Sequence, residues 1–166
     1  YADAVNIYCQ ALKIQPDNAP VLNELATIYA EMKMYDEAIK TYSQALLLDP
    51  DMEFSWYNLG TLHDQLDNTE SAVDAYEKAL KINPFSADTL IALGIGYGKL
   101  ERYSDAIKIF QNSLNYHPDN ATIHYNIGYV HLLSGNFSKA YEVAERLCSL
   151  DYELSLMLFD EIHKRE

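Results

Sequence analysis

The prolines of this chain recur on a fixed period, and that period constrains the fold more than any other feature. Each proline in the series follows the previous one by 34 residues: Pro16, Pro50, Pro84 and Pro118. Two other columns keep the same step. An alanine stands twelve residues before each proline, and an aromatic ring stands eight before, as at Tyr8, Tyr42, Tyr76 and Phe110. A sequence that repeats every 20–50 residues or so is typical of proteins built from stacked copies of one structural unit.

Hydrophobic spacing predicts two helices in each repeat. Over residues 2–14 the apolar side chains fall three and four apart on one face. That helix should end before Pro16, because proline lacks an N–H donor and disfavours helix in the preceding residue. The same spacing predicts helix pairs at 20–33 with 36–48, 53–66 with 70–82, 87–100 with 104–116, and 121–134 with 138–150. Small residues at Ala26, Gly60, Gly94 and Gly128 should let the paired helices approach closely.

One more amphipathic helix is predicted from residue 152 to residue 164. Its apolar stripe contains Leu154, Met157, Leu158 and Ile162. Two roles are open for it. It could cap the stack with a polar outer face, as repeat arrays require, or Leu156 and Phe159 could enter the inner groove and block it.

The stretch 53–86 carries seven residues of a known repeat motif: Trp56, Leu59, Gly60, Ala72, Tyr76, Ala79 and Pro84. It resembles the tetratricopeptide repeat (TPR), and the resemblance covers roughly residues 1–151. It implies an all-α fold, an α-α superhelix (TPR solenoid) of antiparallel helix pairs, as a single array over 1–166. The parts would be the second helix of a truncated repeat (1–18), four repeats (19–52, 53–86, 87–120 and 121–151) and a capping helix (152–166). The sequence departs from the pattern at His63, Ser113 and His124, and Ala144, Leu147 and Tyr152 replace the motif's last residues.

The first residue of the chain also falls within this register. Tyr1 matches Tyr35 and Tyr103, which open the second helix of their repeats. The first helix of the first repeat is therefore missing, and we expect the chain to be an excerpt of a longer protein.

Net charge narrows the choice of partners. The chain has 12 Lys and Arg against 25 Asp and Glu, a formal charge of −13. Nucleic acid and anionic membranes should be repelled, since their binding proteins present basic surfaces, whereas basic partners should be attracted. No apolar run reaches the ~20 residues of a membrane helix. Cys9 and Cys148 lie four repeats apart, too far for a disulfide, and a cytoplasmic location is expected.

Catalytic motifs are not found in the sequence. Gly94, Gly96 and Gly98 faintly resemble a phosphate loop, but they lie inside a predicted helix. His124 and His131 are seven residues apart on one helix, yet both occupy packing columns, which favours core histidines over metal ligands. We expect no enzyme activity, no cofactor and no metal.

The resemblance implies that the first helix of each pair lines a concave groove that holds a peptide or helix of a partner. Eight residues on the predicted inner faces are the candidate site: Tyr57, Asn58, Ile91, Ile95, Tyr125, Asn126, Tyr129 and Leu133. The three tyrosines lie outside the packing columns, so they should bind ligand, unless they stack on adjacent repeats. The resemblance implies that the two asparagines hydrogen-bond the backbone of a bound peptide. Acidic residues gather in the N-terminal half of the groove and apolar ones in the C-terminal half, which predicts a protein or peptide ligand with basic and apolar residues.

Three functions remain open at this point. The first is a non-catalytic protein–protein interaction scaffold. The second is the substrate-recognition region of a larger enzyme, such as an O-GlcNAc transferase-like glycosyltransferase; a broken asparagine column at Glu24 and Ala92 counts against it. The third is a self-assembling module that forms a homo-oligomer.

Overall fold

The computed structural model describes residues 1–165, which form ten α-helices and no strand. Contacts divide the chain into unit 1, Tyr1–Pro84, and unit 2, Phe85–Glu166, and each is described by itself. Unit 1 contains α1 (Ala2–Ile14), α2 (Ala19–Glu31), α3 (Tyr35–Leu48), α4 (Glu53–Gln65) and α5 (Thr69–Ile82). Unit 2 contains α6 (Ala87–Lys99), α7 (Tyr103–Leu114), α8 (Ala121–Leu133), α9 (Phe137–Leu147) and α10 (Tyr152–His163). The predicted all-α class is confirmed, with helix ends within a few residues of those expected. The single array of repeats over 1–166 stays a prediction.

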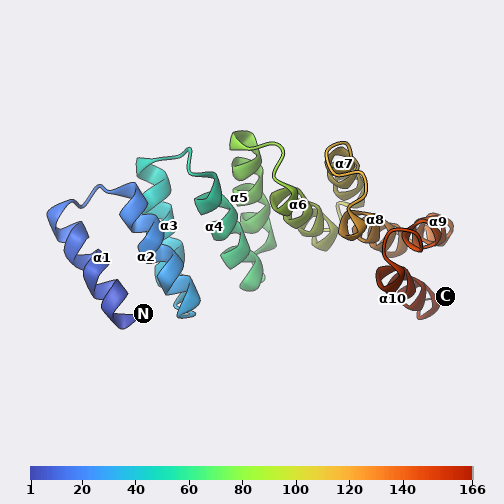
Figure 1. The fold of residues 1–166 in the computed structure, drawn as a ribbon, viewed down its shortest axis with the longest axis horizontal. Coiled ribbons are helices and arrows are strands. Elements are labelled where there is room, and N and C mark those ends of the chain that lie inside the picture. The colour runs from blue at the N-terminus through green and yellow to red at the C-terminus, as the bar shows by residue number, and fades with distance from the viewer. Residues whose placement is uncertain (166) are drawn as a thin grey trace. The chain divides into compact units, whose positions relative to one another are not determined.

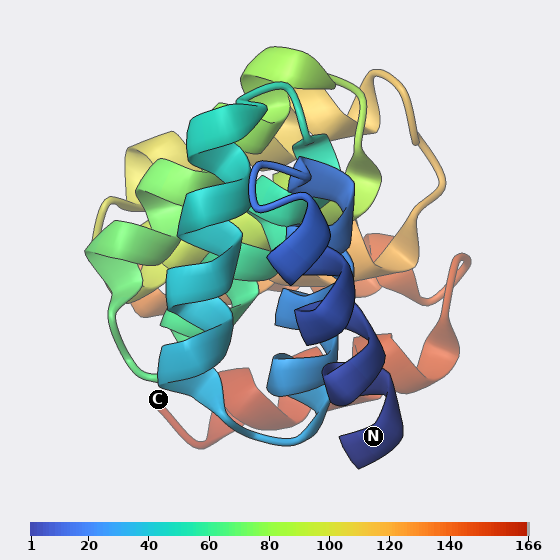
Figure 2. The same cartoon turned by 90° about the vertical axis from the view of Figure 1, so that its left-hand side faces the viewer.

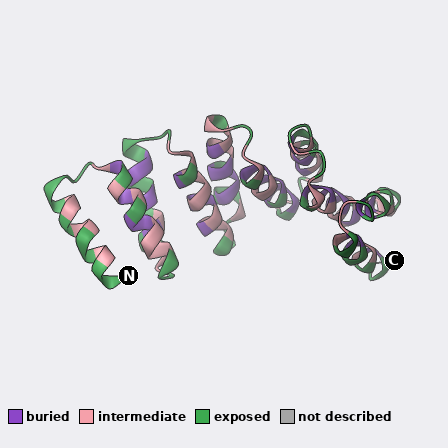
Figure 3. Cartoon of the chain, viewed as in Figure 1, coloured by how far each residue is buried: buried purple, intermediate pink, exposed green. Residues whose placement is uncertain are grey.

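Helices that follow one another across a three-residue turn pack as antiparallel pairs. In unit 1, α2 packs against α3 and α4 against α5; in unit 2, α6 packs against α7 and α8 against α9 (Figure 1). The helix α1 stands at the end of unit 1, in front of α2 and α3 in Figure 2. It has no fully buried residue, whereas α2 to α5 bury the sides that face their neighbours (Figure 3).

The turns inside the pairs share one backbone geometry. The second residue of each turn has positive φ: Lys33, Asp67, Glu101 and Gly135, at 59°, 58°, 58° and 76°. In the first turn the N–H of Lys33 donates to the carbonyl of Ala30, and the N–H of Met34 donates to that of Tyr29. These two bonds are the Schellman arrangement that ends a helix and satisfies its last carbonyls. It recurs in all four turns, so the 34-residue period extends to backbone conformation.

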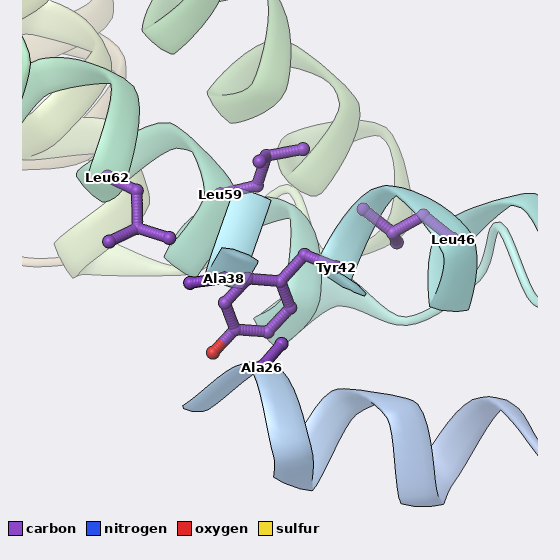
Figure 4. Close-up of a cluster of buried hydrophobic side chains, with 6 residues drawn as sticks. All are labelled: Ala26, Ala38, Tyr42, Leu46, Leu59 and Leu62. Atoms are coloured by element: carbon purple, nitrogen blue, oxygen red, sulfur yellow. The ribbon is translucent and has the colours of Figure 1, made fainter. Parts of the chain in front are cut away.

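In the first three pairs, a small residue on the first helix lies opposite an aromatic ring of the second helix. In unit 1, a Cβ built on Gly60 would lie 2.6 Å from the Tyr76 ring. In unit 2, a Cβ on Gly94 would lie 2.4 Å from the Phe110 ring. The core of the first pair is similar, with Ala26 and Ala38 beside the Tyr42 ring and Leu46, Leu59 and Leu62 around it (Figure 4). The predicted close approach of the paired helices is confirmed. The Tyr42 ring also shares its core with Leu59 and Leu62 of α4, so it joins its own pair to the next one.

The last helix, α10, completes the core of unit 2. Asp151 caps it by accepting a hydrogen bond from the Leu154 backbone at 3.0 Å. Leu158 and Ile162 are fully buried against α9, where Ala140, Ala144 and Leu147 are buried too. Ser155 is also buried and donates to the carbonyl of Ala144 at 2.7 Å.

Two expectations for α10 are wrong. Met157 is not part of the buried stripe, because its side chain is 54% exposed. Ser155, which was not predicted, lies on the buried side of the helix. The alternative that Leu156 and Phe159 block the groove also fails. Leu156 is exposed, and the Phe159 ring packs against Tyr141 of α9 with the ring centroids 5.9 Å apart.

Candidate functional site

Unit 2 contains an apolar cavity between α6, α7 and α8, here called the α6–α8 cavity. It measures about 420 Å³. Five of the eight predicted site residues line it: Ile95, Tyr125, Asn126, Tyr129 and Leu133. Four further lining residues were not predicted: Gly98, Lys99, Phe110 and Val130. Asn126 and Lys99 are the only lining residues whose side chains carry an amide or a charge.

The two tyrosines of the cavity are stacked on each other. The rings of Tyr125 and Tyr129 have centroids 6.1 Å apart and planes 9° apart. Both are half-buried and pack against the core that α9 and α10 share. The Arg165 guanidinium lies 6.0 Å from the Tyr129 ring centroid. Burial raises the pKa of Tyr125 above its ordinary value of 10.0, so its hydroxyl remains a hydrogen-bond donor. The rings therefore form a preorganised wall that packs on one side and lines the cavity on the other.

Unit 1 has a cavity at the corresponding place, the α2–α4 cavity, of about 230 Å³. Its eight lining residues are Thr27, Ala30, Glu31, Tyr42, Asn58, Thr61, Leu62 and Gln65. Each has a counterpart 68 residues later in the α6–α8 cavity, where 68 is two periods of 34. The two cavities are therefore the same position of the repeat with different side chains.

A chain of hydrogen bonds joins three residues that line the α2–α4 cavity: Asn58, Tyr42 and Thr27. The Asn58 amide Nδ2 donates to the Tyr42 hydroxyl at 3.1 Å. The Tyr42 and Thr27 hydroxyls are 2.8 Å apart, and Thr27 donates onward to the Asn23 carbonyl at 3.1 Å. Because Thr27 has only one proton, Tyr42 must be the donor in their shared bond. The amide of Asn58 is thus held by the chain itself.

The α6–α8 cavity lacks this chain of hydroxyls. Phe110 stands where Tyr42 stands in unit 1, and Ile95 stands where Thr27 stands. Asn126, the counterpart of Asn58, makes no side-chain hydrogen bond with any residue from 1 to 165. Charge at the rim also changes sign, from Glu31 in unit 1 to Lys99 in unit 2. The structure therefore leaves one amide without an internal partner inside an apolar cavity.

The other three predicted site residues lie elsewhere. Asn58 lines the α2–α4 cavity, as described above. Tyr57 is half-buried in unit 1, and its ring centroid is 5.9 Å from that of Tyr76. Ile91 is half-buried on α6, one turn before Ile95, and lies outside the α6–α8 cavity. Phe110 could have been singled out from the sequence, because it is the only phenylalanine in a column of tyrosines.

Of the two histidines predicted to lie in the core, His124 is buried, whereas His131 is half-buried and lines a cavity between α7, α8 and α9. Nε2 of His124 lies 2.9 Å from the Pro118 carbonyl. Trp56, two periods earlier, donates from Nε1 to the Pro50 carbonyl at the same 2.9 Å. A carbonyl only accepts, so Nε2 of His124 carries the proton. Among the residues described, no group of three or more His, Cys, Asp or Glu side chains could hold a metal ion. None of the helices within 1–165 is long and apolar enough to span a membrane.

Comparison with known proteins identifies the repeat. Two family models, both described as tetratricopeptide repeat, match residues 17–84 and 91–151. No curated protein matches the sequence. Among solved structures, the crystal structure of MamA protein has a TM-score of 0.83 at 22% identity, covering 90% of this chain and 81% of that one. MamA from residue 41 onward, from Desulfovibrio magneticus RS-1, has a TM-score of 0.83 at 17% identity, covering 92% and 86%.

A third solved structure is that of YrrB, described as a TPR protein with an unusual peptide-binding site. Its TM-score is 0.76 at 18% identity, with 96% of this chain and 92% of that one covered. At these identities the similarity concerns the fold alone. Taken with the 34-residue period and the antiparallel helix pairs, the two family matches show that the chain belongs to the tetratricopeptide repeat family.

Proposed function

We infer that this chain is a non-catalytic protein-interaction module and that the α6–α8 cavity binds an extended or helical segment of a partner protein. The inference rests on one observation. The Asn126 amide lies in an apolar cavity without a hydrogen bond from residues 1–165, whereas the equivalent Asn58 is bonded to Tyr42. An amide in apolar surroundings is stabilised by a partner, and a peptide backbone offers both a donor and an acceptor.

The rest of the cavity suits a side chain beside that backbone. Ile95, Leu133 and Val130 provide aliphatic surface, and the stacked rings of Tyr125 and Tyr129 provide a rigid aromatic wall. Recognition sites commonly combine such an apolar surface with a few polar groups that fix orientation. The partner segment would therefore place a large apolar residue in the cavity. The basic residues expected elsewhere in the ligand follow from the net charge of −13.

Two substitutions test the site without removing its packing. Phe110→Tyr should supply a hydroxyl where Tyr42 has one, so that Asn126 becomes satisfied internally. Gly98→Ala should narrow the cavity, and its Cβ would meet only Val130 at 3.8 Å, an ordinary contact. It should also stabilise α6 by up to about 1 kcal/mol, because alanine favours helix over glycine. Asn112→Ala, on an exposed position of α7, is the matched control in the same unit.

The probe is a set of peptides enriched on the purified chain from a display library of random 12-residue sequences. We expect the enriched peptides to contain large apolar residues. Their affinity should fall about tenfold, equivalent to 1.4 kcal/mol, for Phe110→Tyr and Gly98→Ala but not for Asn112→Ala. Unchanged affinity for both cavity variants would show that the α6–α8 cavity is not the site, and failure to enrich any peptide would refute peptide binding by this chain.

A further inference from the structure

Unit 1 has a second cavity that the proposed function does not use. This α3–α5 cavity measures about 570 Å³ and lies between α3, α4 and α5. The residues that matter here are Trp56 and His63 on α4, and Glu70, Asp74 and Lys78 on α5. Trp56 and His63 lie on a different side of α4 from Asn58 and Thr61, which face the α2–α4 cavity. The two cavities can therefore be occupied independently.

A cation of the chain itself already occupies the aromatic surface of this cavity. The Lys78 ammonium lies 4.4 Å from the centroid of the Trp56 ring. The same nitrogen is 2.7 Å from a carboxylate oxygen of Asp74. A tryptophan face combined with a carboxylate is a favourable site for a positive charge. The contact is also easily released, because the Lys78 and Asp74 side chains are 39% and 64% exposed, and exposed ion pairs are weak.

The other ionisable groups of the cavity do not oppose a second cation. Glu70 adds a further carboxylate to its lining. Burial lowers the pKa of His63 below its ordinary value of 6.5, so the ring is neutral at neutral pH. Its Nδ1 is buried and makes no hydrogen bond with the described residues. Without Lys78, the lining would carry two negative charges and no positive one.

The corresponding cavity in unit 2 keeps a carboxylate, Glu142, in the place of Asp74 but lacks the indole ring and the second carboxylate. The α7–α9 cavity, of about 400 Å³, has His124 in the place of Trp56 and Lys139 in the place of Ser71. Arg146 stands where Lys78 stands. The counterpart of Glu70 is Ser138. The groove shape is thus common to the repeat, whereas the indole ring and the pair of carboxylates belong to unit 1.

We propose that the α3–α5 cavity binds an arginine side chain of a basic partner segment, which stacks on Trp56 and pairs with Asp74 in place of Lys78. Arginine fits better than lysine for two reasons. Its planar guanidinium stacks on aromatic faces, and it forms two parallel hydrogen bonds to one carboxylate. Lys78 then acts as a placeholder that the incoming guanidinium displaces. The formal charge of −13 attracts segments of that kind.

The experiment uses the fluorescence of Trp56, the only tryptophan of the chain. The probe is N-acetyl-arginine amide, and the matched neutral compound is N-acetyl-citrulline amide. The arginine compound should change the emission of Trp56 in a saturable way, and the citrulline compound should not. Lys78→Met keeps the apolar stem and removes the resident charge, so the concentration for half-saturation should fall about fivefold.

A second substitution shows which carboxylate is responsible. Adding Asp74→Asn to Lys78→Met should reverse the fivefold gain. Asp36→Asn, at an exposed position in the first turn of α3, is the control with the same change of charge. An absent or unsaturable response in Lys78→Met, an equal response to citrulline, or an equal effect of Asp36→Asn and Asp74→Asn would each overturn the proposal.

Discussion

Substitution of Leu158 should destabilise unit 2 strongly. In the α8–α9 pair, this side chain of α10 occupies the space that an aromatic ring of the second helix occupies in other pairs. In the α4–α5 pair of unit 1, Tyr76 lies opposite Gly60. In the α6–α7 pair of unit 2, Phe110 lies opposite Gly94. In the last pair that column holds Ala144. Leu158 of α10 fills the space instead: its Cδ2 lies 2.4 Å from where a Cβ on Gly128 would be. The side chain is fully buried.

The size of the effect follows from this geometry. Leu158→Ala leaves a cavity in a closed core, which destabilises by about 2.7–5 kcal/mol. Gly128→Ala alone gains up to ~1 kcal/mol of helix propensity but forces its methyl onto Leu158, an overpacking penalty of about 1–3 kcal/mol. With Leu158 truncated, that overlap disappears, and Val143 at 3.0 Å is the nearest remaining neighbour. The same methyl then partly fills the space that Leu158 leaves. Gly128→Ala should therefore change from harmful to helpful.

The assay is urea unfolding of the wild type, both single variants and the double variant, followed by far-UV circular dichroism. Amide hydrogen exchange in α10 reports the same change locally. The control is Gly98→Ala, which adds the same methyl to a helix where only Val130 is near, at 3.8 Å. It should stabilise equally with and without Leu158→Ala. The reasoning fails if Gly128→Ala shifts the free energy of unfolding by the same amount in both backgrounds, within about 0.5 kcal/mol.

Two further predictions concern polar groups in the cores. Ser113 is fully buried, and its hydroxyl has no hydrogen-bond partner among the described residues; Ser113→Ala should raise the free energy of unfolding by about 1–3 kcal/mol, and an unchanged urea midpoint would contradict this. Burial lowers the pKa of His63 and of His131 below 6.5. As the pH falls, the two histidines therefore take up protons in the unfolded chain before they do so in the folded one. The stability that the neutral rings contribute is complete above pH 6.5 and is lost as the pH falls below it. The double change to glutamine should therefore weaken the dependence of the melting temperature on pH between neutrality and about pH 5, and melting curves with the same pH dependence as the wild type would show that neither ring contributes.

Most of the fold could be predicted from the sequence because packing columns and turn positions recur every 34 residues. Prolines and apolar spacing placed the helices, and small residues at Gly60 and Gly94 indicated where the paired helices would approach closely. The helix α10 was harder, since it lies outside the period. Apolar spacing predicted the helix but not which side of it is buried. Ser155 is buried and donates a hydrogen bond to the Ala144 carbonyl, whereas Met157 is exposed.

The candidate site was predictable only in part, for a physical reason. Inner-face spacing selected Ile95, Tyr125 and Tyr129, and the structure brings these side chains to one cavity. Spacing cannot show whether a polar group is already satisfied, because that depends on a residue from another helix. The bond from Asn58 to Tyr42 joins residues 16 apart in the sequence. Comparing positions two periods apart would have revealed the difference at Phe110.

Departures from the repeat pattern therefore divide into two kinds. Some are compensated inside the chain: His124 makes the same bond to a proline carbonyl as Trp56, and Leu158 fills the space left by Ala144. These need no ligand to explain them.

Other departures are not compensated, and their consequences depend on exposure. Ser113 has an unpaired hydroxyl at 0% exposure, so no ligand can reach it and it can only reduce stability. Phe110 deprives Asn126 of a hydroxyl partner, but that amide lines an open cavity. A polar group that has no partner inside the chain, at a place that a ligand can reach, can gain a hydrogen bond on binding. That contrast, more than membership of a repeat family, makes the α6–α8 cavity the part of this chain to test for ligand binding.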